Sequence, residues 1–201
     1  MAGEMDGLAD AYRAPVADLD DERGQAAGRE ETDYVVSPTK LALLFTATLG
    51  LYSVYWFYKH WQHQKLVASP RIWPWARAIF SVFYVSALFK QLDWDTRSVG
   101  RAHTWNPTAN AAIFIVINVT ARVLDKLSGL GGGSIGLAVV ALALPLFSVF
   151  PLLTAQRVVN QSVGDPQGLG NSRLGGGGVV VLLVGALVWA LMVVGLLASP
   201  E

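Results

Sequence analysis

The chain has 201 residues, of which 53% are hydrophobic and 15% are charged, and its mean hydropathy is +0.41. Soluble domains carry about 25% charged residues, so this composition indicates a membrane protein. Cysteine is absent, which excludes disulfide frameworks and thiolate metal sites. Residues 1–38 hold ten acidic and three basic residues, a net charge of −7, whereas residues 39–201 hold five acidic and twelve basic residues, a net charge of +7.

The first part of the chain, residues 1–36, has no sustained apolar period. It is rich in Asp, Glu, Gly and Ala, and such a segment buries too little apolar surface to offset the entropy of ordering it. We therefore expect a disordered acidic tail followed by a transmembrane helical domain over residues 37–201. The tail has neither the basic nor the apolar region of a secretory signal peptide.

Five segments of the second part are candidates for membrane-spanning helices, because a span needs about 20 mainly apolar residues. Ser37 followed by Pro38 is a typical helix start. The second segment has only twelve uncharged residues between Arg77 and Lys90. Four spans are the alternative, with the second or third segment lying in the membrane interface. The predicted class is an all-α polytopic bundle with spans at about 38–59, 74–90, 107–124, 135–154 and 179–198.

The tryptophans support this prediction. Six of the seven lie close to ends of the expected spans, where indole rings favour the headgroup level and form an aromatic belt. Trp189 falls within the last span and is expected to pack against other helices. The belt consists of Trp56, Trp61, Trp73, Trp75, Trp94 and Trp105.

Orientation and association are less strongly encoded. With five spans, eight Lys and Arg residues lie on the side of the tail and six on the other side, so the positive-inside rule gives no bias. We expect a cytoplasmic tail because no export signal precedes it. Ala42, Thr46 and Gly50 form a small-residue groove on the first helix, and Ala186 and Ala190 form a shorter one. Such grooves allow close helix packing, within one chain or in a homo-oligomer.

Three motifs could carry chemistry, and each has a simpler interpretation. His60 and His63 would share a helix face and could bind a metal, but no nearby carboxylate completes a site. Asp93-Trp94-Asp95 matches the D-x-D of cation-dependent glycosyltransferases, without a nucleotide-binding domain around it. The G-x-S-x-G at 132–136 lacks a downstream histidine. We therefore predict no catalytic, cofactor-binding or metal-binding residues.

The third span carries the polar residues Asn118 and Arg122, spaced by four. They could line a cavity or a substrate path. The alternative, which we favour, is a hydrogen bond between helices.

A family resemblance rests on residues 48–61. This segment resembles T-L-G-L-Y-x-x-Y-W-F-Y-K-N-W, which marks a group of small bacterial multi-pass membrane proteins with a domain of unknown function; His60 stands where the group has Asn. Residues 36–41 resemble the group's V-S-P-x-K-L, and residues 156–160 its Q-R-x-x-N. The resemblance implies a bacterial inner-membrane protein and no particular activity. It adds the candidate positions Gly50, Tyr52, Tyr55, Trp56, Tyr58, Gln156, Arg157 and Asn160.

These observations predict an integral membrane protein without enzymatic activity, with a structural, scaffolding or regulatory role. Its expected partners are the lipid bilayer and a second copy or another membrane protein, with no nucleic acid and no identified small-molecule substrate. A small transporter or channel subunit that works as a homo-oligomer is the second hypothesis, and a membrane-embedded enzyme is the third.

Overall fold

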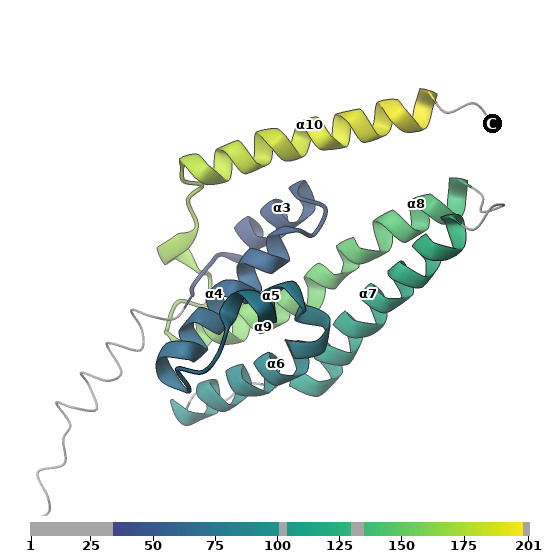
Figure 1. Cartoon of the computed structure of the whole chain (residues 1–201). Helices are drawn as coiled ribbons and strands as arrows, with labels where there is room; N and C mark the ends of the chain where they lie inside the picture. The colour runs from purple at the N-terminus through teal and green to yellow at the C-terminus, as the bar shows by residue number, and fades with distance from the viewer. Residues whose placement is uncertain (1–33, 101–103, 130–134, 199–201) are drawn as a thin grey trace, which may run out of the picture. The chain divides into compact units, whose positions relative to one another are not determined.

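The computed structural model describes residues 34–100, 104–129 and 135–198, and these residues form helices joined by turns, with no β-strand among them (Figure 1). This agrees with the predicted all-α class. Most of the expected disordered tail, residues 1–33, lies outside the described residues. Residues 34–36 of that tail have no regular secondary structure but are held against the helices, with Val36 fully buried, so the predicted disorder is wrong for these three.

The first expected span, 38–59, is divided into two helices. Helix α3 (Pro38–Ala47) begins with proline in its first turn, and the Ser37 hydroxyl accepts a hydrogen bond from the Lys40 amide over 3.2 Å. Leu49 and Gly50 then take positive φ angles of 52° and 89°. This conformation is unusual for leucine and ends the helix. Helix α4 (Tyr52–Val67) follows the break.

The second expected span, 74–90, is also divided. Helix α5 (Pro74–Ile79) is followed by Phe80, and helix α6 (Ser81–Ser98) then continues for eighteen residues. The amphipathic sequence of α6 buries one face, which includes Val85, Leu88 and Phe89.

Within the described parts of the chain, three helices are long and apolar enough to cross a membrane. The first is α7 (Pro107–Gly129). The second runs without interruption over Gly136–Ser162 and consists of α8 (Ile135–Ala143), the 3-10 helix η1 (Leu144–Ser148) and α9 (Val149–Ser162). Pro145 lies in η1, where the α-helical winding changes to 3-10, whereas Pro151 lies within the first turn of α9. The third is α10 (Gly176–Ala198), after the short 3-10 helix η2 (Leu169–Asn171).

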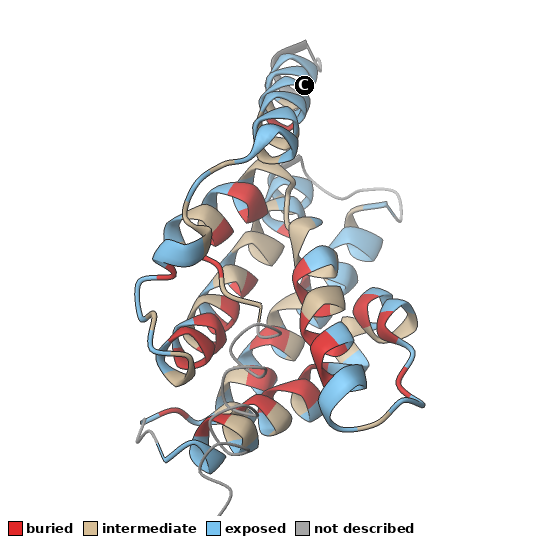
Figure 2. Cartoon of the chain, turned by 90° about the vertical axis from the view of Figure 1, so that its left-hand side faces the viewer, coloured by how far each residue is buried: buried red, intermediate tan, exposed pale blue. Residues whose placement is uncertain are grey.

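The core lies where α4, α6, α9 and the first half of α7 meet (Figure 2). Trp56 and Phe57 are fully buried there, and the Phe57 ring packs edge-on against Phe114 at 5.4 Å. Three of the predicted belt tryptophans, Trp56, Trp61 and Trp105, are therefore core residues, because aromatic packing between helices buries them. The exposed ones are Trp73, Trp75 and Trp94.

Helix α10 packs closely against α3, because Gly185 lets the backbones of the two helices approach each other. A Cβ atom on Gly185 would overlap the carbonyl oxygen of Ala47 and lie 2.8 Å from the Ala47 Cβ. Four residues further on, the Trp189 indole donates to the carbonyl of Thr46 over 3.0 Å. The predicted packing of Trp189 against another helix is confirmed. The contact uses Gly185 and Trp189, rather than the expected groove at Ala186 and Ala190.

Helix α3 lies beside the first half of α10. At its start, the amide of Ser37 donates to the carbonyl of Asn171, shortly before α10 begins. At its end, Ala47 meets Gly185, the tenth of the 23 residues of α10. Ten helical residues are about 15 Å long, so α3 is about half as long as a helix that spans the hydrocarbon core of a membrane.

Candidate functional site

A buried glutamine connects three separate parts of the chain. Gln156 in α9 is fully buried, and its Oε1 accepts from the Trp56 indole over 2.7 Å. Its Nε2 donates to the carbonyl of Tyr34 over 3.0 Å and to Oδ1 of Asn160 over 2.8 Å. The ring nitrogen Nε2 of His60 lies 3.3 Å from the same Oε1. One side chain thereby joins α4, α9 and the segment that precedes α3.

Two asparagines extend this arrangement. The amide of Asn160 donates to the carbonyl of Val36 over 3.0 Å, and the amide of Asn171 donates to the carbonyl of Val35 over 2.8 Å. Side-chain amides thus bind the carbonyls of three consecutive residues, 34–36. We call Gln156, Asn160 and Asn171 the amide clamp. It satisfies buried backbone acceptors that no helix or sheet would otherwise pair.

The loop between α9 and α10 closes over the same segment. Gly168 has a φ of +63°, and a Cβ there would lie 2.6 Å from the Val36 oxygen and 2.7 Å from the Ser37 nitrogen. Only glycine permits both this conformation and this approach. The ammonium of Lys40 donates to Oδ1 of Asn171 over 2.6 Å and to the carbonyl of Arg173 over 2.8 Å.

The loop itself is held by Asp165. Its carboxylate accepts hydrogen bonds from the amides of Leu169 and Gly170, over 2.9 Å and 2.8 Å. These bonds stabilise the charged form and lower the pKa of Asp165 below its usual value. The ionised carboxylate therefore fixes the turn that presents Gly168 and Asn171.

Aromatic rings cover the tyrosine at the start of the clamped segment. The hydroxyls of Tyr34 and Tyr52 share a hydrogen bond of 2.8 Å, and the Tyr34 ring meets Tyr55 and His60 edge-on at 5.9 Å and 5.7 Å. Burial raises the pKa of Tyr34 well above its usual value. The phenol therefore stays protonated and serves as a packed hydrogen-bonding group.

The structure brings together several residues suggested by the resemblance. Tyr52, Trp56, Gln156 and Asn160 all contact the clamped segment or one another. Other suggested residues lie outside this cluster. Arg157 is exposed, the Tyr58 ring stacks on Trp75 at 4.2 Å, and Gly50 forms the helix break against the ring of Phe45.

The polar pair of the third expected span does not join the clamp. The amide of Asn118 donates to the carbonyl of Phe114 in the same helix over 2.8 Å. The expected hydrogen bond between helices is therefore wrong for the Asn118 amide, because the carbonyl one turn earlier on α7 is the nearer acceptor. Arg122 is exposed.

The two histidines that share a helix face, His60 and His63, are both buried in α4. The rings of His60 and Trp56 are in contact, with centroids 4.1 Å apart. Among the described residues, no group of three or more His, Asp or Glu side chains could hold a metal ion.

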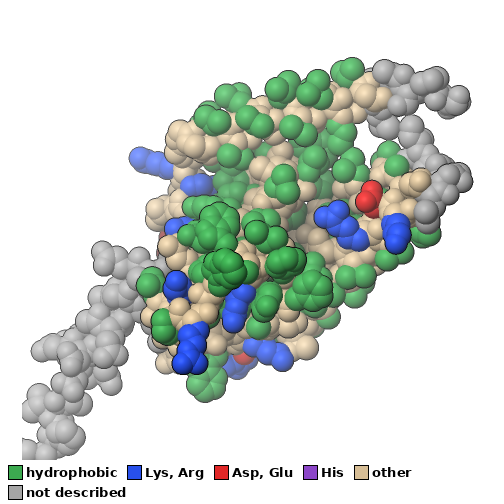
Figure 3. Space-filling view, viewed as in Figure 1, with side chains coloured by type: hydrophobic (Ala, Val, Ile, Leu, Met, Phe, Trp, Pro, Cys, Tyr) green, Lys and Arg blue, Asp and Glu red, His purple; other side chains and the backbone are tan. Residues whose placement is uncertain are grey.

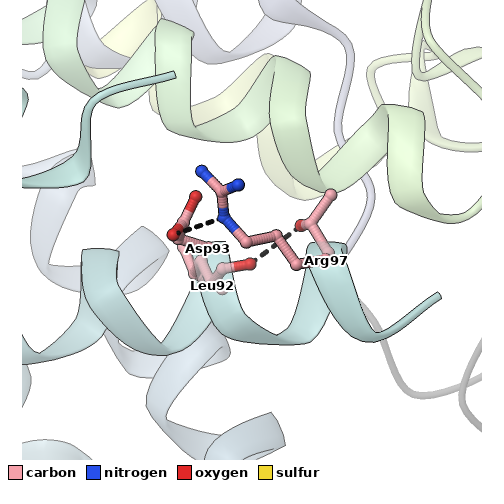
Figure 4. A network of polar contacts seen from close by, with 4 residues as sticks. Leu92, Asp93 and Arg97 are labelled. Atoms are coloured by element: carbon pink, nitrogen blue, oxygen red, sulfur yellow. Dashed lines mark hydrogen bonds and ion pairs between the residues drawn. The ribbon is translucent and has the colours of Figure 1, made fainter. Parts of the chain in front are cut away.

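The D-x-D motif lies within α6, and neither an extended strand nor a loop forms there. Asp93 makes an ion pair with Arg97, one turn later, at 2.9 Å (Figure 4). Asp95 instead accepts from the amides of Gln64, over 2.6 Å, and Gln91, over 3.3 Å. The helix thus directs the two carboxylates to different partners. The Ser134 of the G-x-S-x-G motif lies outside the described residues.

Sequence reasoning missed Lys40, Gly168 and Asn171 as members of the site. Each lies in a turn or at a helix start, where periodicity carries no information. Residues 164–171 contain three glycines and a proline, and this composition indicates only a loop. The contacts of Asn171 span 136 residues of sequence to Val35, which no local pattern encodes.

Searches for similar proteins found no matching family model, no matching curated protein and no matching solved structure.

Proposed function

We propose that this chain is a non-enzymatic, multi-pass protein of the bacterial inner membrane that anchors its acidic arm, residues 1–33, and couples the arm to the membrane helices. The inner-membrane location rests on the resemblance of residues 48–61 and 156–160 to the bacterial group. The observation that carries the proposed role is the amide clamp. Its members bind the backbone immediately after the arm, from α9 and from the loop before α10.

A clamp at this position has a mechanical consequence. The carbonyls of residues 34–36 are bound from α9, which is part of one apolar helix, and from the loop that leads into another, α10. A displacement of the arm by a bound partner would therefore be transmitted to α9 and to the start of α10 together. Such a rigid connection suits a scaffold or a regulatory subunit whose charged arm recruits a second protein.

We propose three membrane crossings, by α7, by the helix over Gly136–Ser162 and by α10, with α3 entering to about half depth. In this arrangement, residues 34–106 and 163–175 lie on one side. Lys90, Arg97, Arg101 and Arg173 flank the crossings there, and five further cations lie between residues 40 and 77. The opposite side has Arg122 and Lys126. Figure 3 shows basic side chains gathered over residues 34–106. The positive-inside rule then assigns this side, and the arm, to the cytoplasm.

Cysteine accessibility separates three crossings from the five that the sequence suggested. The chain has no cysteine, so Ser69→Cys, Gln167→Cys and Lys126→Cys each give a single label site. Three crossings place positions 69 and 167 on one side and 126 on the other. Five crossings place 69 with 126, opposite to 167. Labelling of position 69 together with 126 by an impermeant maleimide would therefore contradict the proposed topology.

The role is tested by purification of the full chain with a C-terminal tag from its native membrane. One variant carries Asn or Gln in place of the ten acidic residues of the arm; a control carries Gln in place of Arg122 and Lys126. We expect a stoichiometric partner with the parent and the control, and its loss with the neutralised arm. A homo-oligomer without another partner, together with solute flux in proteoliposomes, would instead support the transporter hypothesis.

A further inference from the structure

A polar cavity lies between α4, α5 and α6, at some distance in sequence from the amide clamp. Its volume is about 290 Å³, and residues of the loop between α4 and α5 complete its wall. This volume is at the lower end of the range of about 300–1,000 Å³ for ligand pockets. The residues that the argument uses are Trp61, Gln64, Arg71, Arg77 and Gln91.

Two arginines give the cavity a positive charge. The guanidinium of Arg77 lies over the rings of Trp61, at 4.4 Å, and Tyr84, at 5.3 Å. Arg71 is exposed at the rim. Neither forms an ion pair with a described residue. The carboxylate of Asp95 lies beside the cavity, where the amides of Gln64 and Gln91 donate to it. Both arginines are therefore available to an anion, for which a planar guanidinium is well suited.

Two buried polar atoms on the cavity residues have no hydrogen-bond partner. The indole nitrogen of Trp61 is an unused donor, and Oε1 of Gln64 is an unused acceptor. Both side chains are more than nine-tenths buried. The other end of the Gln64 amide donates to Asp95, which fixes its orientation. Unpaired buried polar atoms are rare and costly, so these two indicate a missing ligand with both an acceptor and a donor.

The surroundings of the cavity are those of a membrane surface. Trp73, Trp75, Phe80 and Phe83, from α5 and the segments beside it, are exposed large aromatic residues. Such residues favour the boundary between headgroups and acyl chains. Basic pockets beside membrane helices recognise anionic headgroups.

We propose that this cavity binds the headgroup of an anionic glycerophospholipid with a free hydroxyl, such as phosphatidylglycerol. The phosphodiester accepts from Arg71, Arg77 and the Trp61 indole, and a headgroup hydroxyl donates to Oε1 of Gln64. The proposal rests on the membrane location of the protein, and it is independent of the topology and of the role of the arm.

The test is native mass spectrometry of the purified full-length protein in detergent, titrated with phosphatidylglycerol or phosphatidylcholine. We expect one retained phosphatidylglycerol molecule, bound at least about tenfold more tightly than phosphatidylcholine. The double variant Arg71→Gln and Arg77→Gln should weaken this binding at least about tenfold, because charge-assisted hydrogen bonds are lost. The control, Arg122→Gln and Lys126→Gln, removes the same charge from a part of α7 that does not line the cavity, and should bind as the parent does.

Arg77 also packs on aromatic rings, so a second variant guards against a loss of folding. Trp61→Phe keeps an aromatic ring beneath Arg77 but removes the N–H donor and part of the buried indole. Its melting temperature should therefore fall. Measured well below that melting temperature, it should bind phosphatidylglycerol about threefold to tenfold more weakly. Millimolar sodium phosphate or glycerol 1-phosphate is added as a competitor. Displacement of the lipid by either anion would assign the site to a soluble phosphate and overturn the lipid proposal. Equal losses in the double variant and its control, or no preference over phosphatidylcholine, would overturn it as well.

Discussion

The indole N–H of Trp56 donates to Oε1 of Gln156 over 2.7 Å, across 100 residues of sequence and in a fully buried position. Through this bond the first aromatic helix after the break at Gly50 is joined to α9. The same glutamine binds the carbonyl of Tyr34, so the Trp56–Gln156 pair is the point where three segments of the chain are held in register.

Replacement of Gln156 by alanine should destabilise the protein markedly. It leaves the Trp56 indole and the Tyr34 carbonyl without partners, and each unsatisfied buried group costs about 1–3 kcal/mol. Gln62→Ala, in an exposed position on α4, is the matched control. Unfolding by denaturant in detergent measures both. Similar midpoints for the two variants would mean that the clamp does not stabilise the fold.

Alanine substitutions at two glycines of α10, Gly185 and Gly195, should change the stability of the protein in opposite directions. Alanine in place of Gly185 places a Cβ against the Ala47 carbonyl, and overpacking of this kind costs about 1–3 kcal/mol. Gly195→Ala meets nothing within 4 Å and should stabilise the helix by about 0.5–1 kcal/mol, because alanine has the higher helix propensity. Thermal unfolding in detergent distinguishes them. Equal melting temperatures would contradict the contact between α3 and α10.

Gly168 has a positive φ angle and also lies close to the backbone of Val36 and Ser37. Gly100 has only the positive φ angle, so a comparison of the two separates the conformational cost of a side chain from its steric cost. Gly100 has a φ of +71° but open space around its Cβ position. Alanine there should cost only the conformational penalty of about 1–2 kcal/mol. Gly168→Ala should cost more and should also release residues 34–37, which hydrogen exchange would detect as faster exchange of the Ser37 amide. Unchanged exchange in Gly168→Ala would contradict the role of the loop in holding this segment.

The sequence predicts the helical class well, because long apolar runs such as 179–198 have few alternatives. It does not predict the breaks within the first two expected spans. Thr48–Leu51 is apolar enough to continue a helix, and the break depends on the positive φ angles of Leu49 and Gly50 and on Phe45, which packs against Gly50. Hydropathy measures how apolar a segment is and does not report a reversal of backbone conformation.

The candidate site was predictable only in part. Trp56, Gln156 and Asn160 stand out as polar or aromatic residues in apolar surroundings, and a resemblance draws attention to them. Their partners are backbone carbonyls at 34–36, which have no sequence signature. The burial of Trp56 and Trp61, in contrast to Trp73 and Trp75, likewise depends on which helices pack together, since all four are equally suited to a membrane interface.

The loop between α9 and α10 should loosen in acid. Hydrogen bonds from Leu169 and Gly170 lower the folded-state pKa of Asp165 below the value of 3.8 that an unperturbed aspartate has. A lowered folded pKa means that the stabilisation is fully present above the unfolded value and is lost as the pH falls through the folded one. Hydrogen exchange of residues 165–171 should therefore accelerate below about pH 4, after correction for the intrinsic rate. Asp165→Asn should show this faster exchange already at pH 7, with no further acid transition in the loop. A loop whose corrected exchange is the same at pH 7 and pH 3 in the parent would show that the Asp165 carboxylate does not hold the turn.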